Sequence, residues 1–238
     1  MRFERVIVAL ATLAAVAGTA RLGVWQLDRA AGKQALQQAI EQRQAMPPLP
    51  AQALASDPAA AAAQTHRSIQ VRGRWLPEAT VFLENRQWAG RPGFLVLTPL
   101  ELADGSAVVV QRGWLPRDAG DRTRVDAPAL PSGEVAVTAR IAPPPSRLLE
   151  FDGAGQGAIR QNLDLDAYAG ELRRTLRPLS LLQLDGSTVS ADGLVRDWPR
   201  PASGVHKHYG YAFQWFALSA LLVGLYVWFQ LIRPRRRA

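Results

Sequence analysis

Cysteine is absent from the 238 residues of the chain, and methionine and histidine are scarce, with two and three copies. Without cysteine there is no disulfide framework, no c-type haem attachment, no thiol nucleophile and no thiolate copper site. Two methionines are too few for a thioether copper relay. The sequence also lacks G-x-S-x-G, H-E-x-x-H and a glycine-rich phosphate loop. These absences leave an envelope hydrolase, with a triad assembled only in space, as a minor alternative.

Charged residues are missing from Tyr209 to Ile232. A helix over this stretch would be ~36 Å long, enough to cross a hydrocarbon core of ~30 Å. Four arginines lie in the last six positions, and they predict a transmembrane helix over 208–232 followed by a basic cytoplasmic tail over 233–238. This tail explains much of the net charge of +8 without invoking nucleic acid.

A second apolar stretch lies within residues 1–27, where Val6–Ala20 follows the charged residues at positions 2, 4 and 5 and Arg21 separates it from 22–27. We interpret it as a first transmembrane helix in which Arg21 reaches toward the interface. A cleaved signal peptide is the alternative, because 15–17 and 18–20 resemble cleavage sites. With two spans and the arginines after the second, we expect both termini in the cytoplasm and the central region in the periplasm.

Small residues predict where the two spans pack together. Ala14 and Gly18 share one helix face with Arg21 and Trp25, and the second span carries the pair Ala220 and Gly224. Pairs of this spacing allow two membrane helices to approach closely. We therefore expect the spans to meet through these pairs.

Between the spans the pattern changes from helix to strand. Residues 28–64 predict a helix to Ala45 and then an Ala- and Pro-rich linker. In 65–207 apolar and polar residues alternate over short runs broken by Gly and Pro, and Asp164 is placed to cap a short helix. The expected strands are 69–75, 80–86, 93–100, 106–112, 134–141 and 178–184. The fold class is an extracytoplasmic α+β domain on an antiparallel sheet or partly closed barrel, flanked by two transmembrane helices.

The start of the second span holds the candidate site. His208, Tyr211 and Trp215 fall on one face of a helix, whereas His206 would lie about 200° round it. One interpretation is an interfacial belt, because Tyr and Trp collect at headgroup level. The other is a ligand site, in which a neutral imidazole beside aromatic rings binds a flat metallocofactor such as haem. We expect His66 and Arg112 to be surface residues.

Several blocks resemble, in the right order, the Surfeit locus protein 1 family of assembly factors for haem-copper cytochrome c oxidase. The blocks are G-x-W-Q-L-x-R-x-x-x-K from Gly23, V-x-G-x-W from Val71, G-F-x-V-x-T-P from Gly93, V-x-R-G-W-L-P from Val110 and H-x-x-Y-x-x-x-W from His208. Two positions depart from the family pattern: Lys207 stands where Asn is frequent, and Gly32 stands where Trp is usual.

The resemblance implies a non-enzymatic assembly factor of the cell inner membrane that binds haem a and aids its insertion into the large oxidase subunit. His208 would be the iron ligand, Tyr211, Trp215 and Trp25 would line the haem, and Lys207 and Arg21 would pair with its propionates. Haem a synthase is a further candidate partner. The alternative is a membrane scaffold that docks oxidase subunits and binds no cofactor.

Overall fold

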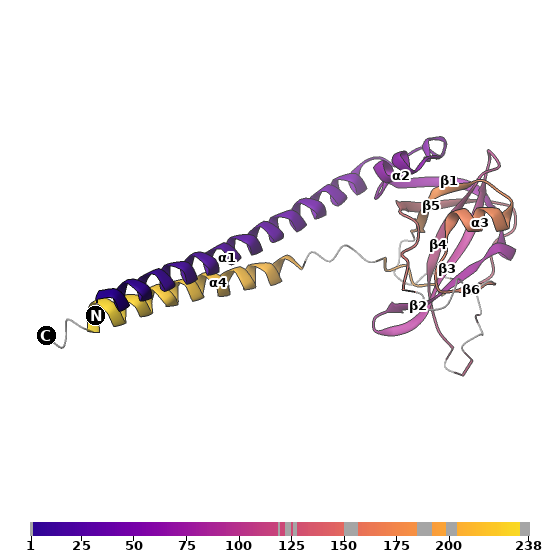
Figure 1. Cartoon of the computed structure of the whole chain (residues 1–238). Helices are drawn as coiled ribbons and strands as arrows, with labels where there is room; N and C mark the ends of the chain where they lie inside the picture. Colours follow the sequence, from indigo (N-terminus) through magenta and orange to yellow (C-terminus); the bar gives the residue numbers. More distant parts are fainter. Residues whose placement is uncertain are drawn as a thin grey trace. The chain divides into compact units, whose positions relative to one another are not determined.

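A computed structural model describes residues 2–118, 120–121, 125, 128–149, 157–184, 192–198 and 204–233. The chain divides into two compact units, coloured along the sequence in Figure 1. One unit combines Met1–Glu41 with Arg200–Ala238, and the other is Gln42–Pro199. Each unit is described by itself.

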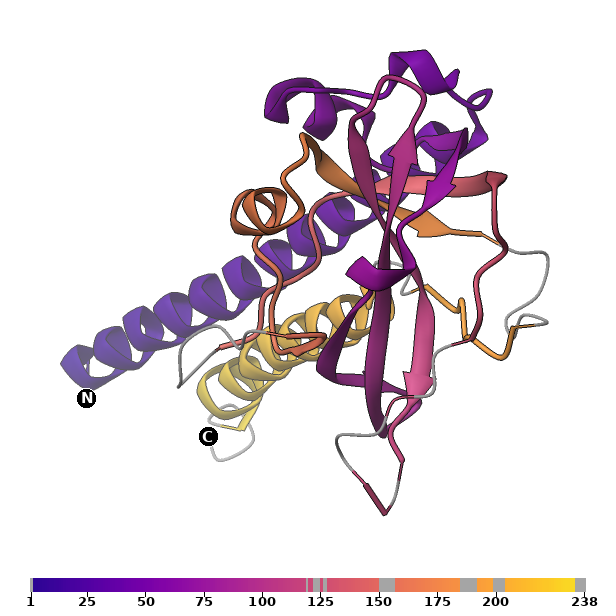
Figure 2. The same cartoon turned by 90° about the vertical axis from the view of Figure 1, so that its right-hand side faces the viewer.

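The first unit is a pair of helices. Helix α1 covers Arg2–Ala45, so the predicted first span and the helix after it form one continuous element. Helix α4 covers Val205–Tyr226 and continues as a π-helical stretch over Val227–Ile232. The two helices run antiparallel and side by side in both views (Figures 1 and 2). Both are long and apolar enough to cross a membrane, over Phe3–Ala45 and Val205–Ile232.

The two helices meet along a seam of less exposed side chains spaced alternately three and four residues apart. This spacing is that of left-handed helix pairs. On α1 the seam positions are Thr12, Val16, Thr19, Gly23 and Gln26, and on α4 they are His208, Ala212, Trp215 and Ser219. At its centre the hydroxyls of Thr19 and Ser219 are 2.6 Å apart. Close to it Gly23 faces Phe216, whose ring would be 2.7 Å from a Cβ at this position.

The expected packing through Ala14, Gly18, Ala220 and Gly224 is wrong. All four residues are exposed, and a Cβ added at Gly18 or Gly224 would meet nothing within 4 Å. The seam itself contains small residues, Gly23 and Ala212, so it allows an equally close approach. It also joins polar partners across the two helices, which the predicted face does not.

The second unit is built on a seven-stranded sheet in the order β1-β5-β7-β4-β3-β2-β6. Its strands are β1 Ser68–Trp75, β2 Val81–Trp88, β3 Arg91–Leu102, β4 Ala107–Pro116, β5 Glu134–Ala142, β6 Ile159–Arg160 and β7 Leu176–Gln183. The sheet is mixed rather than antiparallel throughout, because β2 pairs with β6 and β4 with β7 in parallel. Strand β1 pairs with β5 and, through 73–75, also with β3.

Local sequence explains the elements around the sheet. The turn between β3 and β4 is the expected one: Gly105 has φ 78°, and Asp104 Oδ1 accepts from Ser106 N at 3.0 Å. Helix α2 covers Pro58–Gln64 within the predicted linker, and α3 covers Leu165–Leu172. As predicted, Asp164 caps α3 and accepts from the backbone N–H groups of Asp166 and Ala167.

Strand β4 corrects one expectation about charge. Arg112 is 3% exposed rather than a surface residue, because every residue from Ala107 to Trp114 is buried. Its guanidinium lies 5.9 Å from the ring centroid of Trp75 and 3.6 Å from Asp192. Burial lowers the pKa of Arg112, and Asp192 opposes that shift. His66 also differs from expectation, since it is half-buried; burial first, then Arg140 and Arg43, lowers its pKa.

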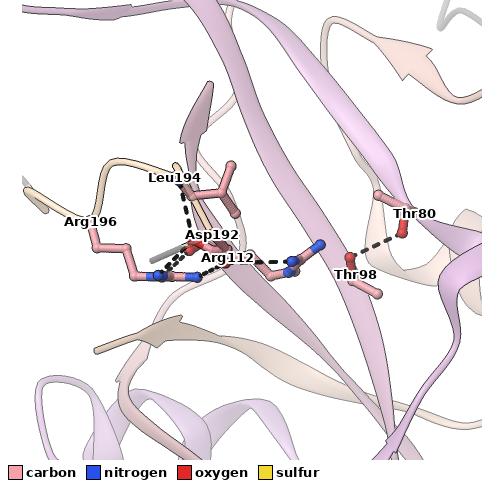
Figure 3. Close-up of polar contacts among 6 residues, drawn as sticks. All are labelled: Thr80, Thr98, Arg112, Asp192, Leu194 and Arg196. Carbon is pink, nitrogen blue, oxygen red and sulfur yellow. Dashed lines mark hydrogen bonds and ion pairs between the residues drawn. The ribbon is translucent and has the colours of Figure 1, made fainter. Parts of the chain in front are cut away.

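The segment 192–198 is bound to β4 through a three-membered charge cluster (Figure 3). Asp192 lies between the guanidinium groups of Arg112 and Arg196 and accepts two bonds from Arg196, at 2.6 and 3.2 Å. Arg196 Nε donates to the carbonyl of Arg112 at 2.5 Å. Two backbone bonds between Trp114 and Val195 continue the attachment. The end of the second unit is therefore fixed to its most buried strand.

Candidate functional site

His208 lies in the first turn of α4 and is half-buried in the seam. Its Nδ1 is 2.7 Å from Oε1 of Gln26 on α1. An amide oxygen only accepts, so in this contact the neutral imidazole donates from Nδ1. The lone pair is then on Nε2, which is the atom available to bind a metal.

His206 occupies a different side of the same helix. Because α4 begins at Val205, both histidines are helical, and they lie about 200° apart around the axis. His206 is exposed and, among the described residues, forms no hydrogen bond or ion pair with α1, whereas His208 is in the seam. The two histidines therefore lie on different sides of α4, as expected if the helix begins before His206.

One flank of the helix pair is defined by contacts between the two helices. The pairs are Gly23 with Phe216, Gln34 with Tyr209, and Val16 with Val223. Gly23 packs against the ring of Phe216, Tyr209 donates to Gln34 at 3.3 Å, and the two valines line one cavity. These pairs fix the rotation of each helix about its own axis.

The predicted site residues gather on the other flank. With a turn of about 100° per residue, Leu22 and Trp25 on α1 and Tyr211 on α4 all project away from the flank of Phe216. Trp215 is half-buried on the same side of the seam, about two helical turns after His208. Tyr211 is 52% exposed and Trp25 is 48% exposed. Tyr211 and Trp215 thus share this flank of α4 with His208, whereas Trp25 lies about 100° round α1 from Gln26, the residue that contacts His208.

A groove of about 760 Å³ lies along α1 on this flank. It is lined by Ala15, Gly18, Thr19, Arg21, Leu22, Val24, Trp25 and Asp28. At Gly18 the groove is open, because a Cβ there would meet no other atom within 4 Å. The groove is mostly apolar at its walls and has charged residues, Arg21 and Asp28, at its margin. Such a surface accepts a flat apolar ligand with polar substituents.

The two cationic residues predicted for the site are less closely grouped than the aromatic ones. Arg21 and Lys207 are exposed, and among the described residues neither forms an ion pair. Arg21 lies on the back of α1, farther from the seam than Trp25, although it borders the groove. Arg29 stacks on Trp25, with 5.5 Å from its guanidinium carbon to the ring centroid. The structure therefore places Arg29, which was not among the predicted site residues, beside the aromatic flank.

Comparison with known proteins identifies the family. The family model described as the SURF1 family matches residues 13–220, which include α1 from Leu13, the whole sheet and most of α4. The chain belongs to the SURF1 family. Uncharacterized SURF1-like proteins of Mycobacterium bovis and Mycobacterium tuberculosis are 29% identical to it over 227 residues, covering 91% of this chain and 80% of theirs.

In this SURF1-family chain, two residues of the site were missed by reasoning from sequence. Gln26 contacts His208, and Lys33 reaches the start of α4, with Nζ 3.5 Å from where a Cβ on Gly204 would lie. Both residues belong to the block from Gly23 that resembles the family pattern, but the resemblance assigned no role to either of them. Gln26 also continues the three- and four-residue spacing of Thr19 and Gly23 that marks the seam.

Proposed function

We propose that this SURF1-family protein is a membrane-bound assembly factor for haem-copper cytochrome c oxidase, which binds haem a at the helix pair and aids its insertion into the large subunit. The observation that carries the proposal is the His208–Gln26 contact of 2.7 Å, which leaves the lone pair of His208 on Nε2. Membership of the SURF1 family supports the oxidase as the recipient.

The residues present fit haem. A single neutral imidazole is a common axial ligand of haem, and His208 would bind the iron through Nε2. Trp25, Tyr211 and Trp215 offer aromatic surface to the macrocycle from both helices. Lys207 is exposed in the first turn of α4 and Arg29 lies over the ring of Trp25, so in this proposal these two cations, rather than Arg21 on the back of α1, pair with the propionates.

Haem a is cargo in this proposal, and the site suits cargo. Tyr211 and Trp25 are about half exposed, so the macrocycle would be covered on one face and open to a partner on the other. The large oxidase subunit, which receives haem a, and haem a synthase, which supplies it, are the partners with the matching chemistry. An open site allows direct transfer between them without release of haem into the bilayer.

The deciding experiment is absorption spectroscopy of the purified full chain. The protein should carry a Soret band when it is made in cells that synthesise haem a, and extraction should identify haem a rather than haem b. The apoprotein mixed with haem a should regain the same spectrum with a stoichiometry that saturates. A protein that supports oxidase assembly in cells but shows no Soret band in either preparation would instead be a scaffold.

We also predict the topology of the chain. Both helices are long and apolar enough to span the membrane, and arginines follow α4 directly. By the positive-inside rule, a cytoplasm-only reporter fused after Ala238 should be active, and one fused at Gly120 should be silent. A reporter active only outside the cytoplasm, fused at the same positions, provides the control. Cytoplasmic activity at Gly120 would contradict the proposed orientation.

A further inference from the structure

We infer that Gln26 is a positioning residue that selects the imidazole tautomer of His208 and sets the strength of Nε2 as a ligand; this inference rests on the proposed function. The evidence is the contact of 2.7 Å between Gln26 Oε1 and His208 Nδ1, made across the two helices. Both side chains are half-buried, so water competes for this bond less than it would at an exposed site.

The register of the helix pair explains why Gln26 meets His208. Seven residues before Gln26, Thr19 contacts Ser219 at 2.6 Å, and between them Gly23 packs under Phe216. These contacts prevent one helix from sliding along the other without losing a polar pair or creating a clash. Gln26 is thereby held within hydrogen-bond reach of His208, and its acceptor is in place before any ligand binds.

The contact has two consequences for a ligand on Nε2. First, the proton is kept on Nδ1, so the coordinating nitrogen is already unprotonated. Second, a hydrogen bond accepted from Nδ1 raises the basicity of the opposite nitrogen, and removing such a partner typically costs about 10–100-fold in metal affinity. A neutral amide is a weaker acceptor than a carboxylate. Gln26 should therefore produce a ligand of intermediate strength, which suits cargo that must be released.

The first measurement needs no haem. In apoprotein labelled with ¹⁵N-histidine, the ring nitrogens of His208 should show the Nδ1–H tautomer. Gln26→Leu should shift His208 toward the Nε2–H tautomer, and Gln26→Glu should retain Nδ1–H. His206, which is exposed on another side of α4, serves as the internal reference because its signals should not change. Unchanged His208 nitrogens in Gln26→Leu would overturn the inference.

The second measurement uses the haem-loaded protein. Gln26→Leu should weaken haem binding about 10–100-fold, and Gln26→Glu should bind at least as tightly as the native protein. The reduction potential of the bound haem should fall with Glu, a stronger acceptor, and rise with Leu. The matched control is Gln34→Leu, which removes a glutamine contact to Tyr209 on the opposite flank of the same helix pair. A purely structural role would give similar effects for both Leu variants and no opposite shifts in potential.

The design separates the inference from the proposed function. Suppose that His208→Ala loses haem, while Gln26→Leu changes neither the tautomer of His208, nor the affinity for haem, nor its reduction potential. The proposed function then stands and the inferred role of Gln26 is wrong. If the native protein binds no haem but the tautomer of His208 follows residue 26, the positioning role stands and the haem proposal is wrong. Loss of the tautomer preference together with weaker haem binding in Gln26→Leu supports both.

Discussion

Replacing His208 by alanine should weaken haem binding by more than about 100-fold, because it removes the ligand itself, and loss of a supporting residue alone costs about 10–100-fold. Few side chains can take its place. The chain has no cysteine, and its methionines are Met1 and Met46, neither of which is in α4 or the seam. The Soret absorbance of equal amounts of purified protein measures the loss. Oxidase activity of cells that carry the variant should fall in parallel.

His206→Ala is the matched control for this prediction. It removes an imidazole two residues away on the same helix, from an exposed side that does not face α1. The control should keep its haem, and the double variant should behave like His208→Ala. Full haem content in His208→Ala would show that the imidazole is not the ligand, and the aromatic residues near it would then be an interfacial belt. Loss confined to His206→Ala would move the ligand by two residues.

The strands were predictable where one face of the sheet is buried and the other is exposed. In β1 the side chains from Ile69 to Trp75 alternate between buried and exposed, and the apolar pattern of the sequence follows this alternation. The turn at Asp104–Gly105 was predictable because its residues fit only a small set of turn conformations. The short strand β6, with two residues, has no periodicity to detect.

Burial of Arg112 could not be predicted from alternation. Strand β4 is covered on both faces and pairs in parallel with β7, so its polar residues Gln111 and Arg112 are buried together with their apolar neighbours. The carboxylate of Asp192, eighty residues away in sequence, makes the burial of Arg112 possible. No local pattern links these two positions, and the relation appears only when the segment 192–198 pairs with β4.

The helix seam was hidden for a different reason. In a membrane-spanning helix the side that faces lipid is as apolar as the side that faces another helix, so hydrophobic periodicity does not show which side is buried. The sequence offered two small-residue faces on α1, one through Gly18 and one through Gly23. The polar residues Thr19 and Gln26 distinguish the true seam, because their partners Ser219 and His208 lie on one face of α4.

The charge cluster at Arg112 leads to the second large expected effect. Asp192→Asn should lower the free energy of unfolding by about 3–5 kcal/mol, which is the usual cost of removing one partner from a buried ion pair. The side chains of Arg112 and Arg196 are only 3% and 2% exposed, so both guanidinium groups would lose their shared carboxylate in a poorly solvated site. Asp192 is 26% exposed, so the value should lie toward the lower end of this range.

Glu171→Gln is the matched control, since it makes the same carboxylate-to-amide change in the ion pair of Glu171 with Arg160, whose side chains are 47% and 13% exposed. It should cost no more than about 1 kcal/mol. Denaturant unfolding of the full chain in detergent, followed by tryptophan fluorescence, measures both variants, because Trp114 bonds directly to Val195 near the cluster.

Arg112→Met completes the set: it leaves the two-bond pair of Arg196 with Asp192 intact, so it should cost less than Asp192→Asn. Equal losses of unfolding free energy for Asp192→Asn and Glu171→Gln would mean that the buried cluster contributes no more than an ion pair whose carboxylate is exposed.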